Sequence, residues 1–481
     1  MGVLTGLAPE RVFYYFEEIS NIPHGSGNTK EISDYIAAFA ASHALEYQQD
    51  AAGNVVIRKA ASAGKEGSAP VMLQGHMDMV AACEADCNLD MASEGLRLKV
   101  QDGRISADGT TLGGDDGIAV AYMLALLEAQ DLAHPPLECV FTVDEEIGML
   151  GAFAMDMSVL KARRLINLDS EQEGVLCVSC AGGVVAVSHL PVTVKPASDL
   201  GVRVTISGCT GGHSGEEIVK QRANPIHLIG RYLFTLKKHT SFRMVSICGG
   251  TADNAIPNSA QTVITLPDEE GAGACFTHAE EMTRILREEF RATDPDITIS
   301  CEAVRTDGKA FDASTTYRVG AAIYTMPDGV QKMSAQVPGL VQTSLNLGVI
   351  ESGVDEVRLN FCVRSSLESE KTELTDRIRS LTAVLGGYMS TEGDYPGMAY
   401  LEHSPLRDVM TAVYEEQYGE KPRVEAVHAG LECGLFAGNI SGLDYVSIGP
   451  DMKGIHTPAE TLDIASVQRV WKYLTAVLAA L

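Results

Sequence analysis

The chain has 481 residues, of which 21% are charged and 45% hydrophobic, and its formal net charge is −27. This length predicts about two to three domains, and the composition fits a globular enzyme and excludes a disordered or fibrous chain. The negative charge opposes binding to nucleic acid or to an anionic membrane, because both need clustered Lys and Arg.

The sequence contains no export or membrane signal that we can identify. The first 18 residues lack a basic segment followed by an apolar one, and the run from Ile118 to Leu127 is about half of what a bilayer requires. Eleven cysteines without framework spacing favour free thiols in a reducing compartment. Cys177 and Cys180 fall on opposite faces of a predicted strand, which argues against a thiol or zinc site. We therefore expect a cytoplasmic protein.

The chain opens with helices and then turns to strands. Residues 9–45 show helical spacing of apolar side chains on either side of a turn in which we take His24 to be structural. The segment 54–60 and the apolar stretch 71–80 are predicted strands, joined by a Gly/Ser-rich loop. We expect this pair to form a hairpin or to be neighbours in a sheet.

The stretch 71–80, VMLQGHMDMV, ends in two side chains that are common at metal sites. Side chains alternate along a strand, so His76 and Asp78 fall on one face. There the carboxylate can hold one imidazole nitrogen while the other nitrogen binds a metal. A lone His-x-Asp is more often a chance surface pair, so the rest of the chain must decide between the two interpretations.

Two aspartates stand at the start of a predicted helix in LGGDDGIAVAYMLALLEAQ. The helix is apolar nearly all round, which predicts burial, and buried carboxylates need partners or a metal. Capping of the helix would explain one of Asp115 and Asp116 but does not need both.

Acidic residues also end the next two predicted strands. The strand Leu137 to Val143 runs into Asp144, Glu145 and Glu146, and the short strand in RRLINLDS ends at Asp169. Ligand sites of open α/β sheets form beyond the carboxyl ends of the strands. We therefore expect these acids to gather with His76.

The pattern changes at about residue 186. The order β-α-β-β-α-β predicts a ferredoxin-like unit, and a second, similar pass follows up to about residue 396. We predict an α/β fold with a mixed-sheet catalytic domain, residues 1–185 and 397–481, interrupted by an inserted α+β lid domain, residues 186–396.

The end of the chain returns to α/β alternation. Its loop PDMKGIHTPAE places His456 before a capping-box spacing with Pro458 at the first helical position, which predicts a helix over 458–480. Alone, His456 would be an ordinary loop residue, but beside the acidic strand ends it supplies a second nitrogen ligand.

These side chains form a set suited to two metal ions. Two imidazoles and three carboxylates fit two Zn²⁺-like ions that share a carboxylate, with cobalt or manganese as alternatives. Adjacent residues at a strand end point in different directions, so only one of Glu145 and Glu146 can easily be a ligand. The other is free to take a proton from a water molecule that the ions activate. The set is His76, Asp115, Glu146, Asp169 and His456.

Motifs across nearly the whole chain resemble those of the aminoacyl-histidine dipeptidases, within the co-catalytic zinc peptidases that include carboxypeptidase G and the aminoacylases. The motifs are GHMDMV, LGGDDGIAVA, TVDEEIGMLGA, NLDSE, GGHSG, NAIPN, HAGLECGLF and GIHTP. The resemblance implies that one ion is held by His76 and Asp169. It implies that Glu146 and His456 hold the other ion, and that Asp115 bridges the two. Asp78 would orient His76, and Glu145 would be the general base.

For the inserted domain, the resemblance implies that His213 of GGHSG lies near the developing oxyanion and that Asn254 and Arg364 contact substrate. The alternative interpretations are that GGHSG is only a glycine turn and that Arg364 is a solvated strand residue. The sequence departs from the family pattern at Asp116, where Asn is expected, and at Ala459, where an acid is more usual and Glu460 is expected to supply the helix cap instead.

The predicted function is hydrolysis of dipeptides, including Xaa-His and β-alanyl-histidine, with a small peptide as the partner and a homodimer left open. An N-acyl amino acid amidohydrolase or a tripeptide aminopeptidase would use the same chemistry. A metal-bearing binding or scaffold protein is the non-enzyme alternative, although decay usually removes the base first and Glu145 is present.

Overall fold

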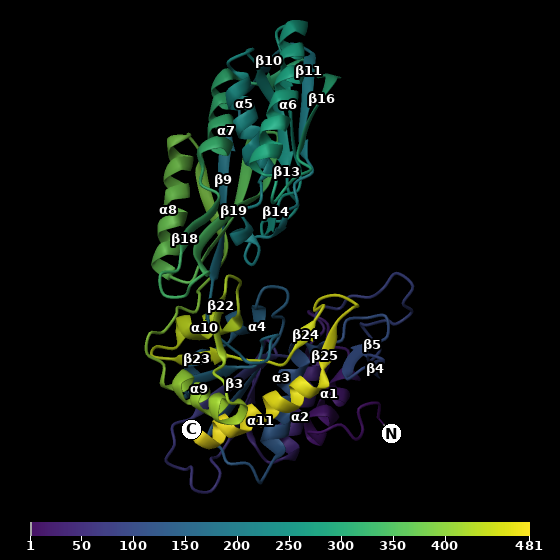
Figure 1. The fold of residues 1–481 in the computed structure, drawn as a ribbon, viewed down its shortest axis with the longest axis vertical. Helices are drawn as coiled ribbons and strands as arrows, with labels where there is room; N and C mark the ends of the chain where they lie inside the picture. The colour runs from purple at the N-terminus through teal and green to yellow at the C-terminus, as the bar shows by residue number, and fades with distance from the viewer. Residues whose placement is uncertain (1) are drawn as a thin grey trace. The chain divides into compact units, whose positions relative to one another are not determined.

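The computed structural model describes residues 2–481 and divides into two compact units (Figure 1). Unit 1 comprises Met1–Cys180, Met398–Ala426 and Leu431–Leu481, and unit 2 comprises Ala181–Gly397 and Val427–Gly430. Unit 2 is thus an insertion in the sequence of unit 1. No helix among residues 2–481 is both long and apolar enough to cross a membrane.

An eight-stranded mixed sheet forms the centre of unit 1, in the order β1-β2-β6-β3-β7-β23-β8-β22. Its inner strands β6, β3, β7 and β23 pair in parallel. Every residue of β3 and β6 is buried, as expected for parallel strands covered on both faces. The strands are β1 (Glu46–Gln49), β2 (Val55–Lys59), β3 (Val71–His76), β6 (Leu137–Thr142), β7 (Arg164–Asn167), β8 (Val175–Cys180), β22 (Arg423–Val427) and β23 (Asp444–Ser447).

The helix α3 (Gly114–Glu128) is the buried helix of unit 1. Its side chains from Ile118 to Leu127 are all buried, and it packs between α1 and β3. A helix that is apolar all round has no solvent face, so its burial follows from its sequence. The other helices are α1 (Glu10–Ser20), α2 (Lys30–Ser42), α4 (Leu150–Ala154), α9 (Pro405–Tyr418), α10 (Glu432–Asn439) and α11 (Ile464–Ala480), with the 3-10 turn η1 (Met157–Val159).

A second, four-stranded sheet in unit 1 has the order β24-β25-β5-β4. It joins residues 98–107 to the segment just before α11, because β25 pairs with β5. The strands are β4 (Leu98–Gln101), β5 (Arg104–Ala107), β24 (Met452–Lys453) and β25 (Thr461–Asp463).

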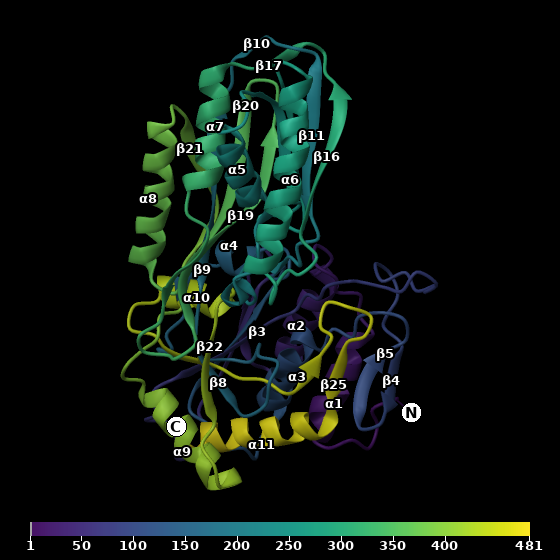
Figure 2. The same cartoon turned by 45° about the horizontal axis from the view of Figure 1, so that its top comes forward.

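Unit 2 is built on one long antiparallel sheet, β16-β11-β15-β13-β19-β20-β9-β21, with β18 paired to β19. Helices α5 to α8 cover one face of it (Figure 2), and their apolar side chains pack on the sheet in a single core. The strands are β9 (Gly182–Pro191), β11 (Leu200–Ser207), β13 (Arg243–Gly249), β15 (Ala260–Thr265), β16 (Thr298–Arg305), β18 (Gly329–Met333), β19 (Val341–Ser352), β20 (Glu356–Ser365) and β21 (Tyr388–Tyr395).

Short elements complete unit 2. Two strand pairs lie outside the long sheet, one of β10 with β17 and one of β12 with β14. The remaining elements are β10 (Val194–Pro196), β12 (Gly212–His213), β14 (Ala255–Ile256), β17 (Lys309–Phe311), η2 (Ile218–Lys220), α5 (Pro225–Leu236), α6 (Glu269–Glu289), α7 (Ala313–Thr325) and α8 (Glu368–Val384).

The strand order explains the doubled unit that the sequence predicts. The first unit, β11-α5-β13-β15-α6-β16, has the ferredoxin order with the fourth strand next to the first. The second unit has the same order only when β9 is taken as its first strand, followed by α7, β19, β20, α8 and β21. The first unit is therefore inserted into the second, between β9 and α7.

Two local predictions were wrong. The strands β2 and β3 are not neighbours, because β6 lies between them and pairs with both. The last helix begins at Ile464 rather than at residue 458, because residues 461–463 pair as β25 and Asp463 caps the helix by accepting from the backbone N–H of Ser466 at 2.8 Å.

All eleven cysteines lie in the described part of the chain and are free thiols. Cys177 and Cys180 lie buried in β8, as predicted, and burial raises the pKa of the Cys180 thiol to about 11.

Candidate metal centre

Three adjacent parallel strands of unit 1 deliver acidic residues and a histidine to one edge of the sheet. His76 is the last residue of β3, Glu145 and Glu146 follow β6, and Asp169 follows β7. Gly75 permits close packing behind His76, since a Cβ there would lie 2.5 Å from the Asp116 carboxylate. The convergence expected at the carboxyl ends of these strands is therefore present.

Asp115 lies between the two histidines. One carboxylate oxygen, Oδ1, lies 3.2 Å from Nε2 of His76, and the other, Oδ2, lies 3.1 Å from Nε2 of His456. Nε2 of His456 is also 2.9 Å from Oε1 of Glu146. A carboxylate that offers one oxygen to each imidazole has the arrangement that a ligand bridging two ions requires.

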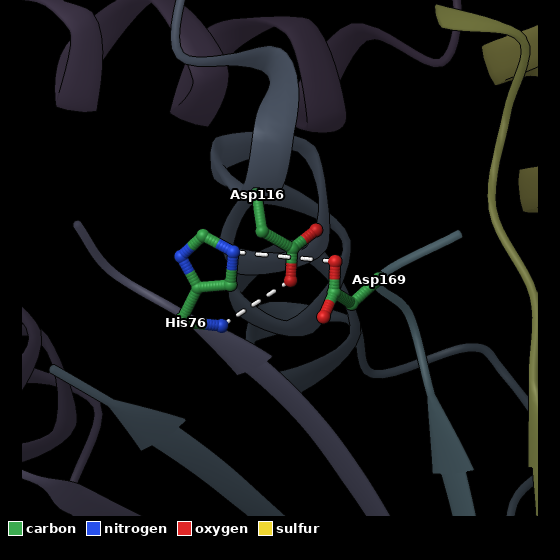
Figure 3. A group of neighbouring side chains, drawn as sticks. All are labelled: His76, Asp116 and Asp169. Atoms are coloured by element: carbon green, nitrogen blue, oxygen red, sulfur yellow. Dashed lines mark hydrogen bonds and ion pairs between the residues drawn. The ribbon is translucent and has the colours of Figure 1, made fainter. Parts of the chain in front are cut away.

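Asp169 and Asp116 complete the side of the site around His76 (Figure 3). Nε2 of His76 is 4.0 Å from Oδ1 of Asp169, and the His76 backbone N–H donates to Oδ2 of Asp116 at 3.2 Å. Burial and neighbouring acids raise the pKa of Asp169 and Asp116 well above the usual carboxyl range. Oδ1 of buried Asp116 has no hydrogen-bond partner among residues 2–481.

Asp78 contacts His76 differently from the expected geometry. Nδ1 of His76 donates to the backbone carbonyl of Asp78 at 2.9 Å, whereas the carboxylate oxygen Oδ1 is 3.5 Å away. That carboxylate instead accepts from the backbone N–H groups of Glu145 at 2.9 Å and Glu146 at 3.3 Å, and from the Ser26 hydroxyl at 2.8 Å. Asp78 thus fixes both the imidazole and the backbone that carries the two glutamates.

These residues fit divalent cations. Three groups have ligand atoms within 4.8 Å of one another: His76 with Asp116 and Asp169, His76 with Glu145 and Glu146, and Asp115 with Glu146 and His456. Burial and nearby acids raise the pKa of Glu145 to about 8, which shows how unfavourable several carboxylates are here without a cation. Mixed imidazole and carboxylate donors suit zinc, cobalt or manganese.

The sequence predicts that Glu460 caps the last helix, and this prediction was wrong. Its carboxylate, 2% exposed, accepts from the backbone N–H groups that lead into α3. His456, four residues earlier, lies in a turn with a positive φ of 61° and is about half exposed.

A buried network behind the site was missed by sequence reasoning. Glu432 of α10 is fully buried, and its Oε2 accepts from Gln74 at 2.6 Å and from Thr142 at 2.5 Å. Oε1 of Gln74 in turn accepts from Asn167 at 2.6 Å. Glu432 thereby connects β3, β6 and β7 next to the ends that carry the proposed ligands. Its one sequence signal is an acidic residue inside the apolar run LECGLF.

Unit 2 contains a separate cationic cluster around Arg364 of β20. The guanidinium is 6% exposed, donates to the Tyr395 hydroxyl at 3.1 Å, and has an Nε without a partner in the described chain. Burial and the Arg364 charge lower the pKa of His213, and they lower that of His428 to about 3. His428 also shares a 2.7 Å hydrogen bond with Ser344. Such a group of buried nitrogen donors suits an anion.

Asn254 is placed differently from the other predicted residues of unit 2. It is exposed, and its backbone carbonyl accepts from the N–H of Ser214 at 2.9 Å. His428 was not singled out from the sequence, because one histidine in a predicted strand gives no spacing signal.

The fold and the site together define an α/β protein equipped to hold divalent ions at the carboxyl edge of a mixed sheet. The model of peptidase family M20/M25/M40 matches residues 72–480. The chain therefore belongs to this family, and it is a peptide hydrolase, as the sequence predicted.

The relatives lie within the group that the motifs indicated. The chain is 34% identical over 480 residues to the cytosol non-specific dipeptidase of Escherichia coli, covering 99% of both chains. It matches the aminoacylhistidine dipeptidase of Vibrio alginolyticus with a TM-score of 0.91 and 35% identity, over 99% of this chain and 98% of the other. The aminopeptidase PepT of Bacillus cereus, at a TM-score of 0.56 and 16% identity over 98% of this chain and 99% of that one, shares the fold.

Proposed function

We propose that the protein is a two-metal dipeptidase that hydrolyses dipeptides, Xaa-His dipeptides among them. The observation that carries the proposal is Asp115, whose two oxygens face His76 and His456 at 3.2 and 3.1 Å. We assign His76 and Asp169 to one ion, Glu146 and His456 to the other, and Asp115 to both. Zinc is the proposed metal, and the cytoplasm is the proposed location, as for the cytosolic relative.

When bound, the two ions would activate a water molecule and polarise the scissile carbonyl. Glu145, which is not among the proposed ligands, accepts the proton and passes it to the leaving amine. Its backbone N–H is held by the Asp78 carboxylate at 2.9 Å, so the side chain starts from a fixed position. Burial raises the pKa of Glu145, and its ionised form would be favoured by the positive charge of bound ions.

The cationic cluster of unit 2 is the proposed site for the free carboxyl terminus of the substrate. Arg364 offers the planar donor set that grips a carboxylate through two hydrogen bonds. Burial and Arg364 lower the pKa values of His213 and His428, which keeps both rings neutral and able to donate one hydrogen bond each. Recognition of a free carboxylate distinguishes a peptide with a free C-terminus from its C-terminal amide.

A panel of substrates tests the proposed function against its alternatives. The zinc-loaded protein would be assayed with a free dipeptide, the matching tripeptide and the matching N-acetyl amino acid. We expect efficient release of amino acids from the dipeptide alone. A preference for the tripeptide or the acetylated amino acid would favour an aminopeptidase or an amidohydrolase instead, and no hydrolysis of any of them would favour a binding protein.

A further inference from the structure

Glu460 makes an unusual set of contacts for a side chain outside the proposed ligand set. Its Oε2 accepts from the backbone N–H groups of Leu112 at 2.8 Å and Gly113 at 3.2 Å. Its Oε1 accepts from those of Gly114 at 2.8 Å and Asp115 at 3.3 Å. One buried carboxylate therefore holds four consecutive N–H groups.

These contacts join two distant segments at the metal centre. Asp115 and Glu460 are 345 positions apart in the sequence, and Asp115 donates its own backbone N–H to the carboxylate. Glu460 ends the turn that follows the turn of His456, because its N–H donates to the carbonyl of Thr457 at 3.0 Å, and that of Thr457 donates to the carbonyl of Gly454 at 3.2 Å. A single residue thus connects the bridging carboxylate to the last histidine of the site.

The chemistry of the contact explains why a carboxylate stands there. The four N–H groups lie in the segment that leads into the regular part of α3, where Asp115 and Asp116 have non-helical backbone angles, so the helix offers these groups no partners. Hydrogen bonds from N–H groups to an ionised acceptor are stronger than neutral ones. A neutral side chain of the same shape would leave some of these buried donors without an acceptor.

We infer that Glu460 is a positioning residue of the metal centre, which fixes the bridging Asp115 relative to His456. This inference rests on the proposed two-ion site. Loss of Glu460 should weaken the ion assigned to Asp115, Glu146 and His456. Glu460 joins the loop that carries Asp115 to the segment that carries His456, so two of the three ligands depend on it. Residues that orient metal ligands typically change metal affinity about 10- to 100-fold when they are removed.

The test is a metal titration of Glu460→Gln, which keeps the shape but replaces one acceptor oxygen by a donor. Glu138→Gln is the matched control, because Glu138 is also buried, at 4% exposure, and accepts two backbone N–H groups at 2.8 Å. It lies near the start of β6, away from the ligand-bearing end. We expect the second Zn²⁺ to bind about 10- to 100-fold more weakly in Glu460→Gln, with an altered Co²⁺ absorption spectrum, and wild-type values in Glu138→Gln.

A second pair of variants serves if Glu460→Gln does not fold. A Cβ on Gly114 would lie 3.1 Å from Oε1 of Glu460, whereas the nearest neighbours of one on Gly117 would be the apolar side chains of Ile19 and Phe16. Gly114→Ala is expected to weaken the second ion and Gly117→Ala to leave it unchanged. Wild-type affinity for both ions in Glu460→Gln or, if that variant is unfolded, in Gly114→Ala overturns the inference. Failure of the two-ion proposal itself would appear in the wild-type titration.

Discussion

At the scale of single residues, Glu145 and Glu146 have different proposed roles although they are adjacent. Oε1 of Glu146 lies 2.9 Å from His456, whereas Glu145 is the proposed base. We expect Glu145→Gln to retain two ions and to lose about 10²- to 10⁴-fold in turnover, the usual range for a general base. Glu146→Gln should lose one ion instead. Metal analysis and steady-state kinetics on both variants check this, and the opposite pattern would reverse the assignment.

Arg364 gives a prediction about substrate recognition. Arg364→Ala should impair hydrolysis of a free dipeptide much more than that of its C-terminal amide, because the amide has no carboxylate to lose. Arg358→Ala, on the same strand but in an exposed pair with Glu351, is the control and should affect neither substrate. Equal losses on the dipeptide and its amide in Arg364→Ala would refute the carboxylate grip.

His428 gives a prediction about pH. Burial, the charge of Arg364 and the neighbouring His213 ring lower its pKa to about 3, below the ordinary value of 6.5. The unfolded chain therefore binds a proton that the folded state excludes, so stability is lost as the pH falls below about 6.5. Between pH 7 and about 4.5 we expect the free energy of unfolding to fall by about 2 to 3 kcal/mol more in the wild type than in His428→Gln. Urea unfolding at both pH values measures the difference, and parallel losses would contradict it.

At the scale of elements, Glu432 shows how α10 supports three strands. Its carboxylate accepts from Gln74 of β3 and Thr142 of β6 with no exposure to solvent. Glu432→Leu would remove the nearest acceptor of both donors and leave them only longer contacts, from Gln74 to the Thr142 hydroxyl at 3.3 Å and from Thr142 to the Gly75 carbonyl at 3.5 Å, at about 1–3 kcal/mol for each group. We expect a lower urea midpoint and weaker metal binding. Glu432→Gln, which keeps an acceptor oxygen, should retain more stability than Glu432→Leu. An unchanged urea midpoint in Glu432→Leu would show that Glu432 does not support these strands.

The sequence predicts most helices and strands because their local pattern is clear. The predictions fail where pairing between distant segments determines the structure. The strand β3 and the buried helix α3 follow from local stretches rich in apolar residues. The capping-box spacing after His456 predicts a helix at 458, but β25 pairs with β5 and Glu460 binds the loop before α3. Neither partner can be identified from local sequence.

At the scale of the whole molecule, the motifs predict the family and the gathering of the acidic strand ends. They do not predict the topology of unit 2, where β9 precedes the first ferredoxin-like unit in the chain but belongs to the second. Strand order in a sheet depends on pairing between distant segments, which a single sequence does not record. His428 and Glu432 were missed for the same reason, since their partners are distant in the chain.

The central claim is that one chain holds two divalent ions that hydrolysis requires. The most direct measurement is a zinc titration of the chelator-treated protein in which bound metal and dipeptide hydrolysis are followed together. We predict saturation at two ions per chain, with activity lost on chelation and restored as the ions return. Saturation at one ion, or full hydrolysis by the metal-free protein, would contradict the account and remove Asp115 from its bridging role.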